Sequence, residues 1–223
     1  MNRAVLKHPS FVPIIVITAI FIAVPESNAQ VEVLKPGEVK TERLETADSN
    51  ILGARATGII EAPIDSVWKV LNDFNKFKEF MPNLRTSFIV DKAILKEIDI
   101  KQKWDREPFE KMLSKYILDQ ANSDTVCSYS VLDLPIVTDR WYLLKKVVDN
   151  EKHTIRWSLA QGNVNVNEGS WELQPYAKNH SQTVVIYTTY SDPGGYIPNW
   201  IIELGFTTTL EDVILGLRRR VLR

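Results

Sequence analysis

The chain has 223 residues, of which 44% are hydrophobic and 25% charged, a composition typical of one globular domain with appended segments. Its formal net charge is −1, so the overall charge indicates neither nucleic acid nor an anionic membrane as a partner. Cys127 is the single cysteine, which excludes an intrachain disulfide and leaves stability to the hydrophobic core. Because Cys127 lies in a strand-like stretch, we expect a buried small side chain rather than a reactive thiol.

Residues 1–29 have the pattern of a secretory signal peptide. Arg3 and Lys7 precede an apolar stretch over residues 11–24, and small residues lead up to Ala29. This order predicts cleavage after Ala29 and export of the mature chain to the periplasm or the exterior. A retained membrane anchor is the competing interpretation, but the apolar stretch is short for the ~20 residues that a spanning helix needs.

Residues 30–48 are polar and lack periodicity, which predicts a leader or linker and places the domain at residues 49–223. The domain is expected to open with a strand that runs to about Glu61. A helix capped by Asp65 follows, and then a short helical piece that ends at Pro82.

Six later stretches alternate apolar and polar residues with period two, as strands do. They are "TSFIVD", "TVCSYSVL", "RWYLLKKVV", "HTIRWSLA", "GSWELQP" and "QTVVIYTTYSD". Most of the turns between them are short enough for hairpins, so we expect one continuous antiparallel sheet. The alternation predicts one covered face, which carries Trp157 and Trp171, and one solvated face.

An extra segment, residues 93–124, separates the first two of these strands. Its apolar residues recur at helical spacing from Phe109 to Ile117, behind Pro108, which predicts an inserted amphipathic helix near 108–117. Three roles are open for it. It could pack on the core, it could act as a lid over a pocket mouth, or it could present Phe109, Met112 and Tyr116 to a partner protein.

The end of the sequence predicts a long helix that starts at a stiff corner. In "SDPGGYIPNWI" the glycine pair permits positive φ angles, and Pro198 suits the first turn of a helix. Apolar residues then recur at three- and four-residue steps as far as Val221. A single curved sheet can cover its inner face only with this helix.

Four stretches in this order resemble the START-type lipid-binding domains of the helix-grip superfamily, which also includes plant pollen allergens, polyketide cyclases and coenzyme-Q-binding proteins. They are "EAPIDSVWKVLNDFNKFKEFMPNL", "LPIVTDRWYLL", "EGSWELQP", and the corner quoted above with its continuation to "LRRRVL". The resemblance covers about residues 51–223. It implies an α+β helix-grip fold, in which a curved antiparallel sheet wraps around the long C-terminal helix and leaves a cavity between them. The segment 93–124 departs from the family's usual pattern.

The residues suggest no catalytic motif, metal site or cofactor. Outside the expected signal peptide the chain has two histidines, His153 and His180, which with Cys127 cannot build a His/Cys metal cluster. The sequence has enough acidic residues for a metal site built from carboxylates alone, but the acidic pairs near residues 97–107 are better explained as part of a solvent-exposed face. The sequence also has no nucleophile-elbow, dinucleotide or phosphate-loop pattern.

With the cavity that the resemblance implies, bulky strand and helix residues become candidates for ligand binding. The candidates are Tyr129, Arg140, Tyr142, Lys146, Trp157, Trp171, Tyr187, Trp200, Phe206 and Leu210. For any single one of them, packing in a solid core is the more ordinary role. Arg140 has a structural alternative, a salt bridge with Asp139 or another acid. The cluster from Arg218 to Arg223 complements a helix C-terminus, or docks on anionic lipid during transfer.

The sequence therefore predicts an exported protein that binds or transfers a hydrophobic small molecule, most simply a lipid, in a cavity between sheet and helix. Transient membrane contact would accompany transfer, and no nucleic-acid partner is expected. One alternative is a cyclase- or hydrolase-like enzyme that uses the same cavity. The other is an interaction module that presents the inserted helix. Perturbed acids or a Tyr–His contact in the cavity would favour the enzyme, and a large exposed apolar patch on the insertion would favour the module.

Overall fold

A computed structural model describes the chain except for residues 1–33, 36, 100–101, 134–139, 177–180 and 196–198, and for the side chains of 199–208. The expected signal peptide therefore lies outside the described residues. The chain divides into two units, residues 1–32 and 33–223, and the fold described here is that of the second. Among the described residues, no helix is long and apolar enough to cross a bilayer.

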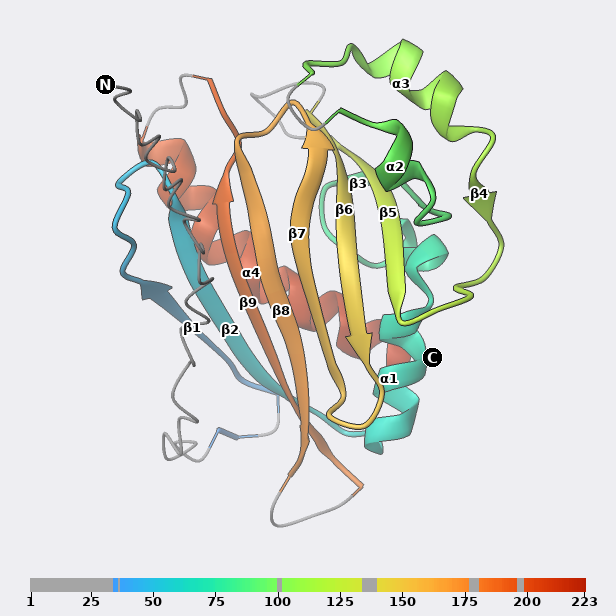
Figure 1. Cartoon of the computed structure of the whole chain (residues 1–223). Coiled ribbons are helices and arrows are strands. Elements are labelled where there is room, and N and C mark those ends of the chain that lie inside the picture. Colours follow the sequence, from blue (N-terminus) through green and yellow to red (C-terminus); the bar gives the residue numbers. More distant parts are fainter. Residues whose placement is uncertain (1–33, 36, 100–101, 134–139, 177–180, 196–198) are drawn as a thin grey trace, which may run out of the picture. The chain divides into compact units, whose positions relative to one another are not determined.

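Nine strands form one antiparallel sheet in the order β1-β2-β9-β8-β7-β6-β5-β3-β4, and the predicted continuous sheet is confirmed (Figure 1). Strands β5 through β9 follow one another in the sheet as they do in the sequence. The strands are β1 Val39–Leu44, β2 Leu52–Ile60, β3 Leu84–Val90, β4 Ile117–Leu118, β5 Thr125–Leu132, β6 Arg140–Asp149, β7 Thr154–Gly162, β8 Val166–Pro175 and β9 Thr183–Asp192.

Five helical elements accompany the sheet in the described chain. They are α1 Ile64–Asn72, the 3-10 helix η1 Phe74–Glu79, α2 Ile94–Glu97, α3 Arg106–Leu113 and α4 Asn199–Val221. The helix after the first strand is confirmed, but its N-cap is Pro63 and Asp65 lies in its first turn without a side-chain capping bond. The corner before α4 is also confirmed, because Gly194 and Gly195 have φ angles of 70° and 76°.

Strand β1 corrects the expectation that residues 30–48 are a linker. Residues 39–44 pair antiparallel with β2, so the sheet begins at Val39 rather than after Ser49. The stretch "VKTERL" shows little hydrophobic periodicity because it is an edge strand in which only half-buried and exposed positions alternate. Val39 nevertheless packs against the core.

The first hydrophobic cluster lies between the sheet and α4, on the face that we call the inner face. Residues of β2, β6, β7, β8 and β9 on this face are buried together with α1, η1 and the C-terminal half of α4. Figure 1 shows α4 running behind the strands. Its contact with β2 is close, since a Cβ at Gly58 would come 2.6 Å from Cγ2 of Ile214. This arrangement is the sheet-on-helix packing that the sequence predicts.

The second cluster covers the opposite face, which we call the outer face. Phe109 and Leu113 of α3 are fully buried against Tyr129 and Trp141, and Ile94 of α2 joins them. The predicted helix near 108–117 is thus present as Arg106–Leu113, and it packs on the core. The expectation of a solvated outer face is wrong at β5 and the first half of β6, because the inserted segment covers it (Figure 1). Further along β6, Lys145 and Val147 are exposed as expected. Phe109 is not presented to solvent.

Candidate functional site

Strand register identifies which predicted site residues share the inner face. Lys146 lies opposite Trp157, Ile155 opposite Trp171, and Trp171 opposite Tyr187, and side chains that are paired in register project from the same face of a sheet. Leu210 of α4 belongs to the same buried cluster as Trp157 and Trp171. The structure therefore brings these residues together under α4.

The centre of the inner face is an aromatic wall made by Trp157, Trp171 and Tyr187. The rings of Trp157 and Tyr187 are stacked, with centroids 5.6 Å apart and planes inclined by 21°. Trp171 also packs against Tyr187, with their ring centroids 4.5 Å apart. Such contacts add to the stability from burial alone and hold the rings in fixed orientations. The wall offers a rigid apolar surface.

A small polar network lies beside the aromatic wall. Nε1 of Trp157 donates a hydrogen bond of 3.0 Å to Oδ1 of Asn167. The hydroxyl of Tyr142 is hydrogen-bonded to the side chains of Asn167 and Ser130. Burial raises the pKa values of Tyr142 and Tyr187, so both phenols stay neutral at physiological pH. The network gives an otherwise apolar surface a few fixed polar groups.

Lys146 is the charged residue of this inner-face group. Its side chain is 7% exposed, and Nζ lies 4.3 Å and 4.7 Å from the ring centroids of Phe74 and Phe77 on η1. Burial lowers the pKa of Lys146 to about 7, because transfer from water penalises the ammonium. The aromatic faces compensate for part of that penalty. Near neutral pH the amine is therefore only partly protonated.

Among the described residues, Arg140 forms a hydrogen bond with the backbone and no ion pair. Its Nη2 donates a 2.9 Å hydrogen bond to the carbonyl of Gly194, which ties the start of β6 to the corner before α4. Nε of Arg140 is buried and has no hydrogen-bond partner among the described residues. Asp139, the acid named as a possible partner, lies outside the described residues.

Tyr129 does not join the inner-face group. It packs in the outer cluster, where its hydroxyl donates a 2.7 Å hydrogen bond to Oε1 of Glu110 on α3. The structure thus separates it from Trp157 and Lys146 by the thickness of the sheet. Trp200 and Phe206 belong to α4, but their side chains lie outside the described residues.

The sequence analysis did not identify three residues that lie on the inner face, namely Ser128, Ser130 and Asn167. The two serines alternate with Cys127, Tyr129 and Val131 along β5, so one set must face each side of the sheet. On hydrophobicity alone we expected the apolar residues of β5 to face inward, but Cys127, Tyr129 and Val131 pack against the inserted segment instead. The regular Ser-x-Ser spacing was the signal that could have found this polar row.

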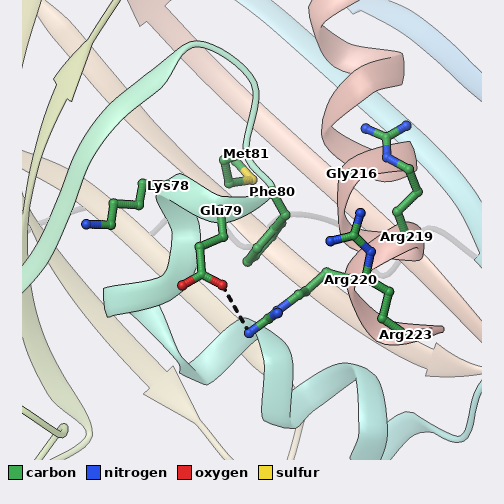
Figure 2. A pocket seen from close by; sticks show the side chains of 8 residues that line it. All are labelled: Lys78, Glu79, Phe80, Met81, Gly216, Arg219, Arg220 and Arg223. Carbon is green, nitrogen blue, oxygen red and sulfur yellow. Dashed lines mark ion pairs between the residues drawn. The ribbon is translucent and has the colours of Figure 1, made fainter.

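A separate pocket of about 150 Å³ lies at the C-terminal end of α4 (Figure 2). Its lining consists of Lys78, Glu79, Phe80, Met81, Gly216, Arg219, Arg220 and Arg223. Arg220 forms an ion pair of 3.3 Å with Glu79. Arg218 instead donates to the carbonyls of Ile59 and Gly37. Two of the clustered arginines therefore have structural contacts, and the pocket does not include the inner-face group.

Metal ligation finds no support in the described residues. No group of three or more His, Cys, Asp or Glu side chains there is placed to hold a metal ion. His153 lies near a turn, packed edge-on against Trp68. Cys127 is fully buried, and burial raises the pKa of its thiol to about 11, as expected for a structural cysteine.

Comparison with known proteins identifies the family. Residues 60–218 match the family described as polyketide cyclase / dehydrase and lipid transport. The chain belongs to this family. The match covers well over half of the sequence and agrees with the START-type resemblance of its motifs. No curated protein matches the chain significantly.

Solved structures of several other proteins share this fold. A STAR-related lipid transfer protein from Xanthomonas axonopodis is 18% identical with a TM-score of 0.62, covering 85% of this chain and 97% of its own. Zhui aromatase/cyclase from Streptomyces sp. R1128 is 11% identical with a TM-score of 0.56, covering 78% and 94%. Human StAR-related lipid transfer protein 5 is 13% identical with a TM-score of 0.55, covering 84% of each chain. At these identities the likeness concerns the fold alone.

Proposed function

We propose that this protein binds a hydrophobic small molecule, a lipid, between the inner face of the sheet and α4, and that it does not convert it chemically. The observation that carries the proposal is the aromatic wall of Trp157, Trp171 and Tyr187 beside a few fixed polar groups. Ligand sites in proteins combine apolar walls with a small number of placed polar groups. Trp157 and its neighbours fit that description.

The family supports a hydrophobic ligand, and its description includes both lipid transport and cyclase chemistry. Among the described residues, the carboxyl group with a shifted pKa is Asp91, which is exposed and has its pKa lowered by the backbone N–H of Ala93. The buried groups with shifted pKa values on the inner face are Tyr142, Lys146 and Tyr187. Binding without turnover is therefore the proposal, and turnover is an outcome that the experiment can detect.

Quenching of tryptophan fluorescence tests the proposed site. Methyl dibromostearate is an uncharged acyl chain whose bromines quench indoles that they contact. We expect saturable quenching, and a smaller quenched fraction in Trp157→Phe because that indole lies in the aromatic wall. Trp141→Phe is the matched control, since Trp141 packs in the outer cluster. The added ester should be recovered intact by mass spectrometry.

Three results would contradict the proposal. Absence of saturable quenching would show that the protein has no site for an acyl chain. Equal losses of quenching in Trp157→Phe and Trp141→Phe would show that the chain does not lie on the inner face. A new product in the recovered material would favour the cyclase- or hydrolase-like alternative.

Export is the second part of the proposal. It rests on the basic start, the apolar stretch and Ala29, and it requires removal of residues 1–29. N-terminal sequencing of protein recovered from the cell envelope or the medium should begin at Gln30. A chain that begins at Met1, or that stays in the cytoplasm, would contradict export.

A further inference from the structure

Lys146 is an interior amine that lacks an acidic partner among the described residues. It lies on β6 between Val126 of β5 and Trp157 of β7, which are its register partners on the inner face. None of the ion pairs described for the chain involves it, and burial is the cause of its shifted pKa. A buried ammonium without a counter-ion is costly, so proteins pair such groups or use them.

The neighbours of Lys146 do not provide the missing charge. The rings of Phe74 and Phe77 approach Nζ from η1, and they supply cation–π attraction but no anion. Trp157, on the adjacent strand, uses its indole N–H for Asn167. The amine is thus next to the aromatic wall and has hydrogen-bonding capacity that these neighbours leave unused.

A second buried polar group without a partner lies close to Lys146. Ser128 is buried, with 1% of the residue exposed, and its Oγ has no hydrogen-bond partner among the described residues. Ser128 pairs in register with Leu144, so it is a diagonal neighbour of Lys146 on the same face. Diagonal neighbours are typically about 7–8 Å apart at their backbones, within reach of a long side chain.

The remaining polar groups on this part of the face already have partners. The hydroxyl of Tyr142 is hydrogen-bonded to the side chains of Ser130 and Asn167, and the hydroxyl of Ser87 donates to the carbonyl of Phe74. The two groups left over beside Trp157 are an ammonium, which can only donate, and a hydroxyl, which can donate as well as accept. A carboxylate presents two acceptor oxygens and one negative charge, which matches this pair.

We infer that the hydrophobic ligand is a long-chain carboxylic acid, with its carboxylate bound by Lys146 and Ser128 and its chain against the aromatic wall. This inference rests on the proposed function and specifies the ligand class for the same site. Binding places the missing anion beside the buried ammonium and gives Ser128 an acceptor. The chain then covers Trp157, the register neighbour of Lys146.

Competition between ligands with the same chain tests the head group. Oleic acid, methyl oleate and oleyl alcohol are used to displace methyl dibromostearate from the wild type, from Lys146→Met and from Lys145→Met. Lys145 is the matched control because it precedes Lys146 and is exposed. We expect the wild type and Lys145→Met to prefer the acid over its ester by about tenfold or more, the size of a charge-assisted hydrogen bond.

In Lys146→Met the preference for oleic acid should disappear, while methyl oleate still binds and so shows that the site is folded. Ser128→Ala should reduce the preference without removing it. If the wild type binds acid and ester equally, or if Lys146→Met keeps the preference, the inference is wrong and the proposed function still stands. If neither acid, ester nor alcohol displaces the probe, and the probe itself does not bind, the proposed function fails as well.

Discussion

The indole of Trp157 lies over the backbone of Gly169, its register partner on β8. A Cβ at residue 169 would come 2.5 Å from Cζ2 of that ring and would also collide with the carbonyl of Thr188. The missing side chain lets the indole lie flat and stack on Tyr187. Gly169 is therefore part of the aromatic wall, although it contributes no side chain to it.

Gly169→Ala should destabilise the protein and disturb the aromatic wall. The added methyl group forces either the indole or the strand to move, and overpacking of this kind typically costs about 1–3 kcal/mol. Denaturant unfolding measures the loss, and near-ultraviolet circular dichroism reports the displaced rings. Glu168→Ala, at the exposed preceding position of β8, is the control and should stay within about 0.5 kcal/mol of the wild type. A stable Gly169→Ala with an unchanged spectrum would show that the indole does not depend on this gap.

Lys146→Met should stabilise the ligand-free protein at and below pH 7. In this range Lys146 is protonated in the unfolded state and at least partly in the folded state, so the wild type bears the cost of the buried charge. The pKa is about 7 in the folded protein and 10.5 ordinarily, so the unfolded chain binds more protons between these values. Wild-type stability therefore rises with pH there, and the advantage of methionine shrinks.

The gain at pH 6 should be about 1–4 kcal/mol, as when other buried charges are replaced by apolar side chains. Denaturant unfolding at pH 6 and pH 10 measures it, with Lys145→Met as the control. Tyr142 and Tyr187 face the same space, and burial raises their pKa values, so they remain neutral over this range. An advantage that is constant with pH would mean that the amine keeps its ordinary pKa.

Tyr129→Phe should weaken the outer cluster and leave ligand binding unchanged. It removes the hydrogen bond to Glu110, worth about 0.5–1.5 kcal/mol, while the phenyl ring keeps its packing against Phe109 and Trp141. Denaturant unfolding and titration with methyl dibromostearate give the two readouts. Weaker binding in this variant would contradict the assignment of Tyr129 to the face opposite the ligand.

Gly216→Ala should destabilise α4, although alanine is the better helix former. In an open helix the change would stabilise by about 1 kcal/mol. Here the new methyl group would collide with the carbonyl oxygen of Phe80, which lies against α4 (Figure 2). We expect a net loss of about 1–3 kcal/mol by denaturant unfolding. Glu211→Ala, at an exposed position of α4, is the control, and a stabilised Gly216→Ala would show that η1 moves away freely.

The fold could be predicted from the sequence wherever one face of an element is buried. Period-two alternation gave β7 with its inward Trp157, and the glycine pair at 194 and 195 marked the corner before α4. The edge strand β1 could not be found in this way, because neither of its faces is fully buried. Its pairing with β2 depends on backbone hydrogen bonds, which any sequence can make.

The candidate site was harder to predict because β5 and the first half of β6 are buried on both faces. Where both faces are covered, hydrophobicity no longer tells which residues point inward, and Tyr129 was assigned to the wrong face for this reason. Lys146, named from the sequence as a candidate ligand-binding residue, does lie on the inner face, opposite Trp157. The orphan hydroxyl of Ser128 follows only from the three-dimensional packing.

Covering the two faces with different parts of the chain also means that the cover of one face is synthesised before that of the other. The outer cluster draws on residues 90–160, all of which precede β8, β9 and α4 in the chain. The inner cluster needs α4, which follows every strand in the chain. A nascent chain lacking α4 would therefore hold a sheet with one protected face and one face of bare indoles, open to aggregation and to any apolar molecule nearby.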